Sequence, residues 1–257
     1  MTDRAVHFVG AGPGAADLLT VRAARLLADA GLVLYPGSYL DPAILADCSP
    51  EAELVDTEHL DLDAIVGRLV DGHRAGLPVV RLVSGDPSVY SAMSEQTRRL
   101  DAAGVPWDVT PGVPAYAAAA ARVGRELTVP LIAQSVVLTR TRQRSTAMPE
   151  AESLTAFAAT RATLVLHLAI TRVRELMAEI EPEYGPDCPV VVVYRASQPG
   201  ELVLRGTIAD IADAVQSAAL RQAAVILVGR ALASRPDPAA GESHLYDPAR
   251  TRGGQTP

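Results

Sequence analysis

The sequence predicts an α/β protein with a mostly parallel sheet in its first half and a mixed sheet in its second half. Short apolar segments alternate with helix-like segments over the first half, which is typical of strands joined by crossover helices. In the second half, strand-like segments outnumber helix-like ones and resemble hairpins. The chain has 257 residues, 49% of them apolar, which is enough for one large domain or for two of about 120 residues each.

The first half begins with a buried strand at residues 5–9, which the glycine-rich GAGPG segment at 10–14 ends. Thr20 is a suitable helix N-cap and predicts a helix over residues 21–30 that stops at Gly31. The elements that follow are strands at 32–35, 79–83 and 107–109 and helices at 65–75 and 93–103. This alternation predicts that the first sheet is mostly parallel.

The second half opens with a helix of small residues at 115–123. Its later elements are strands at 133–139, 163–168, 190–194, 203–207 and 225–228 and helices at 172–180 and 208–219. We therefore expect an N-terminal domain at residues 1–115 and a C-terminal domain at 116–233. The tail at 234–257 is rich in Pro, Gly and polar residues, and we expect it to be partly mobile.

Composition and charge exclude several classes of function. The net charge of −7 argues against nucleic-acid binding, and the basic residues are all Arg, which excludes lysine Schiff-base and P-loop chemistry. No apolar run reaches the roughly 18 residues of a membrane span, and no secretion signal is visible, so we expect a cytoplasmic protein without membrane contact. Cys48 and Cys188 have no Cys or His at ligand spacing, so we expect no metal site.

The first glycine loop could be a simple tight turn, or it could bind a dinucleotide. Gly10-x-Gly12-x-x-Ala15 formally matches the dinucleotide fingerprint, which suggests an NAD(P)-dependent oxidoreductase. However, Pro13 lacks the N–H group that would help to bind a pyrophosphate, and the second strand ends in YPGS without an acidic residue for a ribose. The dehydrogenase interpretation is therefore disfavoured.

Gly/Pro turns follow four predicted strands, at residues 10–14, 35–38, 84–87 and 111–114. In open α/β sheets, ligands bind at these carboxyl ends of the strands. Glycine lets the backbone approach a ligand closely, while proline fixes the turn. The pattern indicates a cofactor that is held by main-chain groups.

Taken in order, the segments GAGPG at 10–14, SGDP at 84–87 and PGVPA at 111–115 resemble the tetrapyrrole methylases. These are the two-domain methyltransferases of siroheme and cobalamin biosynthesis, and the resemblance runs from about residue 6 to 247. Five more segments look like the branch that methylates C11 of a precorrin, with or without cobalt in the ring: YPGS at 35–38, QSVVLTRT at 134–141, MPE at 148–150, YRAS at 194–197 and SHLYDP at 243–248. A different ring position stays open.

The resemblance implies the fold of this family, with S-adenosylmethionine (SAM) bound in a cleft between the two domains and S-adenosylhomocysteine as its product. It also implies a homodimer. Position by position, the cofactor contacts that it implies are Pro13, Ser84, Gly85, Asp86, Val89, Pro114, Ala115, Leu168, Ala196, Ala223 and Ala224. Ser84 stands where several relatives have Gly, and Pro36 stands where uroporphyrinogen III methyltransferases have an acidic residue. No general base is assigned.

A tetrapyrrole substrate carries many acetate and propionate groups, which Arg side chains bind well. Arg140, Arg142 and Arg144 form the densest cationic stretch and could clamp these carboxylates, although a solvated loop is an equally open interpretation. His167 is interpreted as a core histidine, or as a cleft residue beside the cofactor. A non-catalytic nucleotide-binding module stays open as an alternative function.

Overall fold

The computed structural model describes residues 5–37, 40–141, 148–233 and 241–243, and the chain divides into two compact units. Unit 1 comprises Met1–Ala119 together with Arg195–Glu201, and unit 2 comprises Ala120–Tyr194 and Leu202–Pro257. Most of the tail at 234–257, which we expected to be partly mobile, lies outside the described residues. None of the helices in the described ranges is long and apolar enough to cross a membrane.

The five strands of unit 1 form one parallel sheet in the order β3-β2-β4-β1-β5. They are β1 (Val6–Gly10), β2 (Leu32–Tyr35), β3 (Glu53–Asp56), β4 (Val79–Val83) and β5 (Trp107–Thr110). The prediction of a parallel first sheet is confirmed. Because all five strands run in the same direction, the loops that leave their carboxyl ends share one edge of the sheet.

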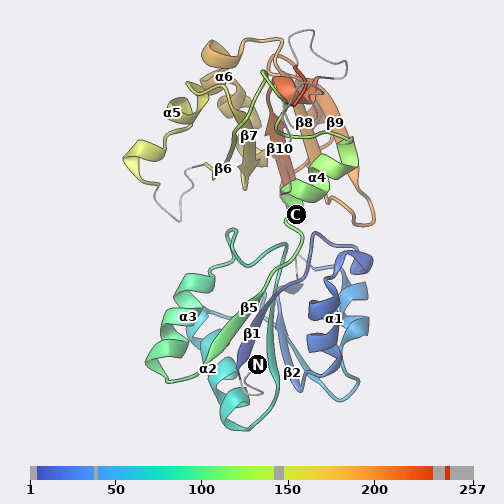
Figure 1. Ribbon diagram of the computed structural model, residues 1–257, viewed down its shortest axis with the longest axis vertical. Coiled ribbons are helices and arrows are strands. Elements are labelled where there is room, and N and C mark those ends of the chain that lie inside the picture. The colour runs from blue at the N-terminus through green and yellow to red at the C-terminus, as the bar shows by residue number, and fades with distance from the viewer. Residues whose placement is uncertain (1–4, 38–39, 142–147, 234–240, 244–257) are drawn as a thin grey trace, which may run out of the picture. The chain divides into compact units, whose positions relative to one another are not determined.

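Helices cover both faces of this sheet, with α1 (Val21–Ala28) on one side and α2 (Leu62–Arg74) and α3 (Met93–Ala102) on the other (Figure 1). Alternate strand residues supply the two cores: Phe8 packs in the cluster with α2 and α3, whereas Val9 packs in the cluster with α1. Thr20 caps α1 as predicted, because its Oγ1 accepts a hydrogen bond from Ala23 N at 3.1 Å. α4 (Ala115–Val123) follows β5.

The sheet of unit 2 is mixed, as predicted, with the order β6-β7-β10-β8-β9. Only the β6–β7 pair is parallel among its described pairs. The strands are β6 (Val136–Arg140), β7 (Thr163–His167), β8 (Pro189–Tyr194), β9 (Leu202–Thr207) and β10 (Ala224–Val228). One face packs against α5 (Leu154–Ala158), α6 (Val173–Tyr184) and α7 (Ile211–Ser217).

Short 3-10 helices connect these elements: η1 (Ala16–Leu18), η3 (Pro42–Asp47), η4 (Glu150–Glu152), η5 (Ile170–Arg172) and η6 (Arg230–Leu232).

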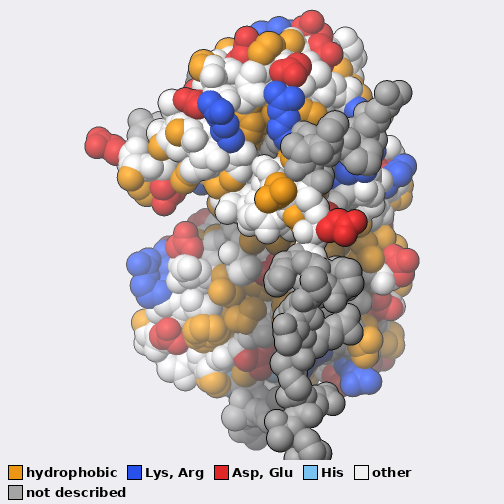
Figure 2. All heavy atoms as spheres, turned by 45° about the horizontal axis from the view of Figure 1, so that its top comes forward, with side chains coloured by type: hydrophobic (Ala, Val, Ile, Leu, Met, Phe, Trp, Pro, Cys, Tyr) orange, Lys and Arg blue, Asp and Glu red, His pale blue; other side chains and the backbone are white. Residues whose placement is uncertain are grey.

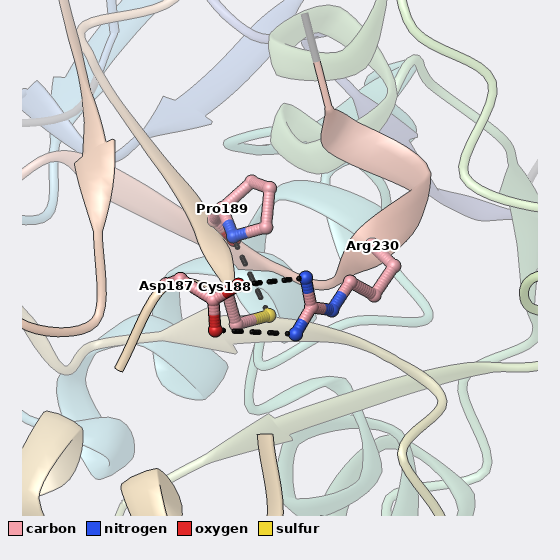
Figure 3. A network of polar contacts seen from close by, with 4 residues as sticks. All are labelled: Asp187, Cys188, Pro189 and Arg230. Atoms are coloured by element: carbon pink, nitrogen blue, oxygen red, sulfur yellow. Dashed lines mark hydrogen bonds and ion pairs between the residues drawn. The ribbon is translucent and has the colours of Figure 1, made fainter. Parts of the chain in front are cut away.

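At one end of the second sheet, the guanidinium of Arg230 in η6 contacts both carboxylate oxygens of Asp187, at 3.2 and 3.3 Å (Figure 3). The adjacent Cys188 thiol donates to the Pro189 carbonyl at 3.9 Å. This network joins the start of β8 to the segment that follows β10.

Two predicted elements are shorter than the sequence suggested. The strand predicted at 133–139 begins only at Val136, because Ala133 pairs with Val129 in a separate bridge. The helix predicted at 208–219 begins at Ile211, because Asp210 Oδ1 accepts a hydrogen bond from Thr207 N at 2.6 Å and closes a turn there. Acidic and basic side chains are interspersed on the face shown in Figure 2, rather than gathered into one patch.

Candidate functional site

The loops after β1 and β4 are joined by main-chain hydrogen bonds. Gly12 N donates to the Gly85 carbonyl at 3.1 Å, and Gly85 N donates to the Gly12 carbonyl at 2.8 Å. Both glycines have positive φ, +72° for Gly12 and +69° for Gly85, a conformation that costs glycine little and other residues more. The two loops therefore hold one another in place beyond the end of the sheet.

The loop after β5 lies directly against these two. A Cβ atom on Gly10 would lie 2.5 Å from Gly112 N and 2.7 Å from the Gly85 carbonyl oxygen. Both neighbours are backbone atoms, so a side chain at Gly10 could not be accommodated by rotating another side chain away. Glycine at position 10 is thus required by the close approach of three backbone segments.

Asp86 links the loop after β4 to the loop after β5. Its Oδ2 accepts a hydrogen bond from Gly112 N at 2.8 Å, and its Oδ1 accepts from Ser88 N at 2.9 Å and from the Ser88 hydroxyl. Partial burial acts to raise the pKa of Asp86, but the hydrogen bonds from Ser88 and Gly112 outweigh it and lower the pKa overall. The carboxylate therefore stays ionised and acts as an acceptor for both loops.

A fourth segment, residues 195–201, joins this group from far along the chain. Gln198 Nε2 donates to the Pro13 carbonyl at 2.7 Å, and Ala15 N donates to Ser197 Oγ at 3.1 Å. These contacts place Ala196, which is buried, in the same unit as Pro13. Ser197 and Gln198 were not predicted as loop-binding residues, since the YRAS segment carries no local sign of its partner.

Eight of the residues expected to contact the cofactor lie in unit 1 on these segments: Pro13, Ser84, Gly85, Asp86, Val89, Pro114, Ala115 and Ala196. A Cβ on Gly85 would lie 3.7 Å from both Pro114 Cα and Ala115 N, so these residues are neighbours. Val89 N donates to the Asp86 carbonyl at 3.1 Å. The Ser84 side chain is exposed at the strand end. The strand-end loops of unit 1 thus bring together residues from four separate segments.

The other three expected contacts, Leu168, Ala223 and Ala224, lie together at one end of the second sheet. The antiparallel register pairs Ile226 with Leu166, so β7 ends, just before Leu168, where β10 begins. Leu168 is 52% exposed, and both Leu168 and Ala223 have positive φ, which is unfavourable for side-chain-bearing residues. Positive φ also occurs at Leu131, Arg161 and Ala219, so this conformation alone assigns no role to the two residues.

Arg140 and His167 lie at the same end of the second sheet, because the parallel register pairs them directly. Burial lowers the pKa of His167 to about 4, so its imidazole is neutral at physiological pH. Arg142 and Arg144, the other expected substrate residues, lie outside the described residues.

A hollow of about 430 Å3 is lined by η5, α6 and the end of α7. Its Arg172 and Arg174 already pair with the carboxylates of Glu175 and Asp213.

The fold and these loops define a two-unit α/β protein whose strand-end glycine loops bring main-chain groups close together. Residues 5–212 match the family described as Tetrapyrrole (Corrin/Porphyrin) Methylases, and the chain belongs to this family. The fold and the family that the loops predicted are thereby confirmed. Within the described ranges, no group of three His, Cys, Asp or Glu side chains could hold a metal ion.

Individual relatives are similar over nearly the whole chain. A precorrin-4 C(11)-methyltransferase of Rhodococcus erythropolis is 51% identical over 247 residues, which cover 96% of this chain and 98% of the relative. The X-ray structure of a cobalt precorrin-4 methyltransferase has a TM-score of 0.87 at 39% identity, covering 90% of this chain and 97% of that one. A uroporphyrin-III C-methyltransferase from Thermus thermophilus, complexed with S-adenosyl homocysteine, has a TM-score of 0.73 at 32% identity and covers 89% and 93%.

Proposed function

We propose that this chain is a SAM-dependent methyltransferase that adds a methyl group to C11 of precorrin-4, giving precorrin-5 in cobalamin biosynthesis. The observation that carries the proposal is similarity along almost the full length to precorrin-4 C(11)-methyltransferases, at 45% to 51% identity. The cobalt-containing ring is the second candidate substrate, because a cobalt-precorrin-4 C(11)-methyltransferase is 40% identical over 249 residues.

The strand-end loops fit the cofactor that this reaction needs. Glycines at positions 10, 12, 85 and 112 leave main-chain groups close together without side chains between them, which suits recognition through the backbone. We propose Pro13, Ser84, Gly85, Asp86, Val89, Pro114, Ala115 and Ala196 as contacts from unit 1, and Leu168, Ala223 and Ala224 as contacts from unit 2. When bound, SAM supplies an activated methyl group on a sulfonium.

The chain's own task is alignment rather than acid–base chemistry. Transfer to carbon is an in-line displacement, and correct positioning of donor and acceptor supplies roughly 7–11 kcal/mol of a reaction barrier. The hydrogen bonds of Asp86 and Gln198 fix the loops of unit 1, so little reorganisation is needed at the moment of reaction. His167, held neutral by burial, carries no charge that would repel a cationic donor.

Arg140, Arg142 and Arg144 are proposed to bind the substrate's carboxylates. Replacing all three with Gln should raise the KM for the tetrapyrrole and leave SAM affinity unchanged. Arg25→Gln, on the exposed surface of α1, is the matched control. An unchanged substrate KM in the triple variant would leave the stretch as an ordinary solvated loop.

We also propose a cytoplasmic homodimer with domains at residues 1–115 and 116–233, as the family resemblance suggests. Light scattering on the purified chain tests the dimer, since a monomer at micromolar concentration contradicts it. Limited proteolysis tests the boundary, because cleavage between the two proposed domains should come before cleavage within either one.

Product NMR after incubation with methyl-labelled SAM and precorrin-4, with and without cobalt, tests the function itself. We expect the label on C11. A label on another carbon would overturn the assignment of the ring position. SAM binding by calorimetry without transfer to either form of the ring would favour a non-catalytic binding module.

A further inference from the structure

Arg81 is a buried cation in the middle of unit 1. It lies on β4, is 6% exposed, and its guanidinium reaches across the carboxyl ends of the neighbouring strands. Its Nε donates to Gln96 Oε1 at 3.1 Å. Its Nη1 donates to three oxygens, the Leu34 carbonyl at 3.4 Å, Thr57 Oγ1 at 3.3 Å and the Leu82 carbonyl at 3.1 Å. The side chain thus connects β2, β4, the residue after β3 and helix α3.

All of these partners are neutral. Within the described part of the chain, no carboxylate lies within ion-pair distance of Arg81, and Nη2 makes no hydrogen bond. Several more accessible arginines, in contrast, pair with carboxylates, such as Arg68 with Glu53 and Arg99 with Asp63. A buried charge without a counter-ion is costly, and buried arginines are normally paired.

The Arg81 guanidinium stays charged although it is buried. Desolvation lowers the pKa of Arg81 to about 10, so the guanidinium is still protonated at neutral pH. The residue that could most easily neutralise it is Gln96, whose amide is fixed by a second hydrogen bond from Nε2 to the Ala92 carbonyl at 3.1 Å. A glutamate would have nearly the same shape at this position, but the sequence places an uncharged amide there.

The location of this charge relates it to the ligand site. Arg81 lies two residues before the end of β4, and its partner Leu34 lies one residue before the end of β2. The loops of the candidate site leave the same edge of the sheet. Gln96 lies in the first turn of α3, whose N-terminus contributes a partial positive charge in the same place. Arg81 therefore places a fixed positive charge beneath strand-end loops that also carry the ionised Asp86 carboxylate, and Glu95 lies in the same first turn of α3.

We propose that Arg81 is the fixed counter-charge for a carboxylate of the bound ligand, and that Gln96 is neutral so that this charge stays available. The inference deepens the proposed function and rests on it, because precorrin-4 carries acetate and propionate groups and SAM carries one carboxylate. Arg81 acts from below the loops as a positioning residue. It favours ligands that place a carboxylate near the ends of β2 and β4.

Gln96→Glu separates this role from a purely structural one. The substitution leaves the guanidinium and its contacts in place but gives Arg81 an internal counter-ion. If Arg81 only connects the strands, the variant should be at least as stable as the wild type and bind its ligands equally well. If Arg81 is a counter-charge, the variant should fold and bind a carboxylate ligand more weakly.

The measurements are substrate KM, kcat and SAM Kd for the wild type, Gln96→Glu and the control Ala102→Glu, which adds the same charge at an exposed position of α3. We expect the precorrin-4 KM of Gln96→Glu to rise about tenfold, which corresponds to roughly 1.4 kcal/mol. An equal rise in SAM Kd instead would assign the counter-charge to the cofactor's carboxylate. No change in either constant, in a folded variant, would overturn the proposal.

A second pair of variants keeps the test decisive if Gln96→Glu does not fold. Arg81→Lys and Arg81→Gln both lose the forked guanidinium, but only lysine keeps the charge. The proposal expects the KM of the Gln variant to exceed that of the Lys variant, whereas equal constants contradict it. Wild-type methyl transfer to C11 is measured in the same assay, so failure of the proposed function is seen separately from failure of the Arg81 inference.

Discussion

Asp86 accepts a hydrogen bond from the backbone N–H of Gly112 at 2.8 Å and so joins the loops that follow β4 and β5. Removing this carboxylate leaves the Gly112 and Ser88 donors without their acceptor. We expect Asp86→Ala to weaken SAM binding at least about tenfold, since hydrogen bonds to charged groups contribute roughly 1.5–3 kcal/mol. Calorimetric titration with SAM measures the effect. Asp29→Ala, at the exposed end of α1, should bind SAM normally.

The same carboxylate should make stability depend on acid pH. The pKa of Asp86 in the folded protein is lower than in the unfolded chain, so its contribution is complete above the unfolded value of about 3.9 and is lost as pH falls through the folded value. We expect the Tm difference between the wild type and Asp86→Asn to be constant above about pH 5 and to shrink below about pH 4. A difference that stays constant down to pH 3 would contradict this account.

Substitution of Gly10 by Ala tests the close contact of the three loops. Gly10→Ala would place a methyl group 2.5 Å from Gly112 N and 2.7 Å from the Gly85 carbonyl. The backbone must shift to relieve these contacts, so we expect a loss of about 2–3 kcal/mol in stability together with weaker SAM binding. Chemical denaturation and calorimetry measure the two effects.

Gly67 provides the matched control for this substitution. It lies inside α2, and a Cβ there would have no heavy atom within 4 Å. Gly67→Ala should therefore stabilise the protein by about 0.5–1 kcal/mol through helix propensity alone. If both alanine variants had the same stability, the contact at Gly10 would not be the cause.

Most of the fold was predictable because its signals are local. Buried runs such as VHFVG at Val6–Gly10 and VVVVY within Pro189–Tyr194 identify strands, and the turn residues that follow identify their ends. Strand β3 was missed because Glu53–Asp56 is short and largely exposed, and lacks an apolar pattern. Its place at the edge of the sheet depends on pairing with β2, which no local segment encodes.

The candidate site was predictable in its segments but not in its connections. The family resemblance identified the loops around Pro13, Asp86 and Pro114, yet gave no indication that Gln198 binds the first loop or that Asp86 binds Gly112. Arg81 was not predicted as a functional residue either, because a single arginine in a strand gives the same sequence pattern whether its side chain is exposed or buried. Such long-range contacts are determined by how the strands assemble, which a single sequence does not show.

Cys188 should be almost inert towards thiol reagents in the folded protein. It is fully buried, and this burial raises the pKa of its thiol to about 11. The charge of Arg230 acts to lower this pKa, and the charge of Asp187 acts to raise it. The thiolate is the reactive species, so both access and ionisation are suppressed at neutral pH. In a Cys48→Ser background, we expect labelling of Cys188 by a disulfide reagent only after denaturant is added. Rapid labelling of the native variant would show that unit 2 opens readily at the Asp187–Arg230 network.

His167 should remain neutral well below the pH at which an ordinary histidine is protonated, because burial lowers its pKa to about 4. Its folded pKa is below the unfolded value, so its contribution to stability is present above about pH 6.5 and is lost as pH falls from there towards 4. His167→Gln should therefore lose less stability than the wild type over this range. Thermal unfolding between pH 7 and 4 measures the difference, and the imidazole resonances of His167 in NMR report its protonation directly. A midpoint near 6.5 would mean that the ring is solvated, and would make it available as a proton acceptor during turnover.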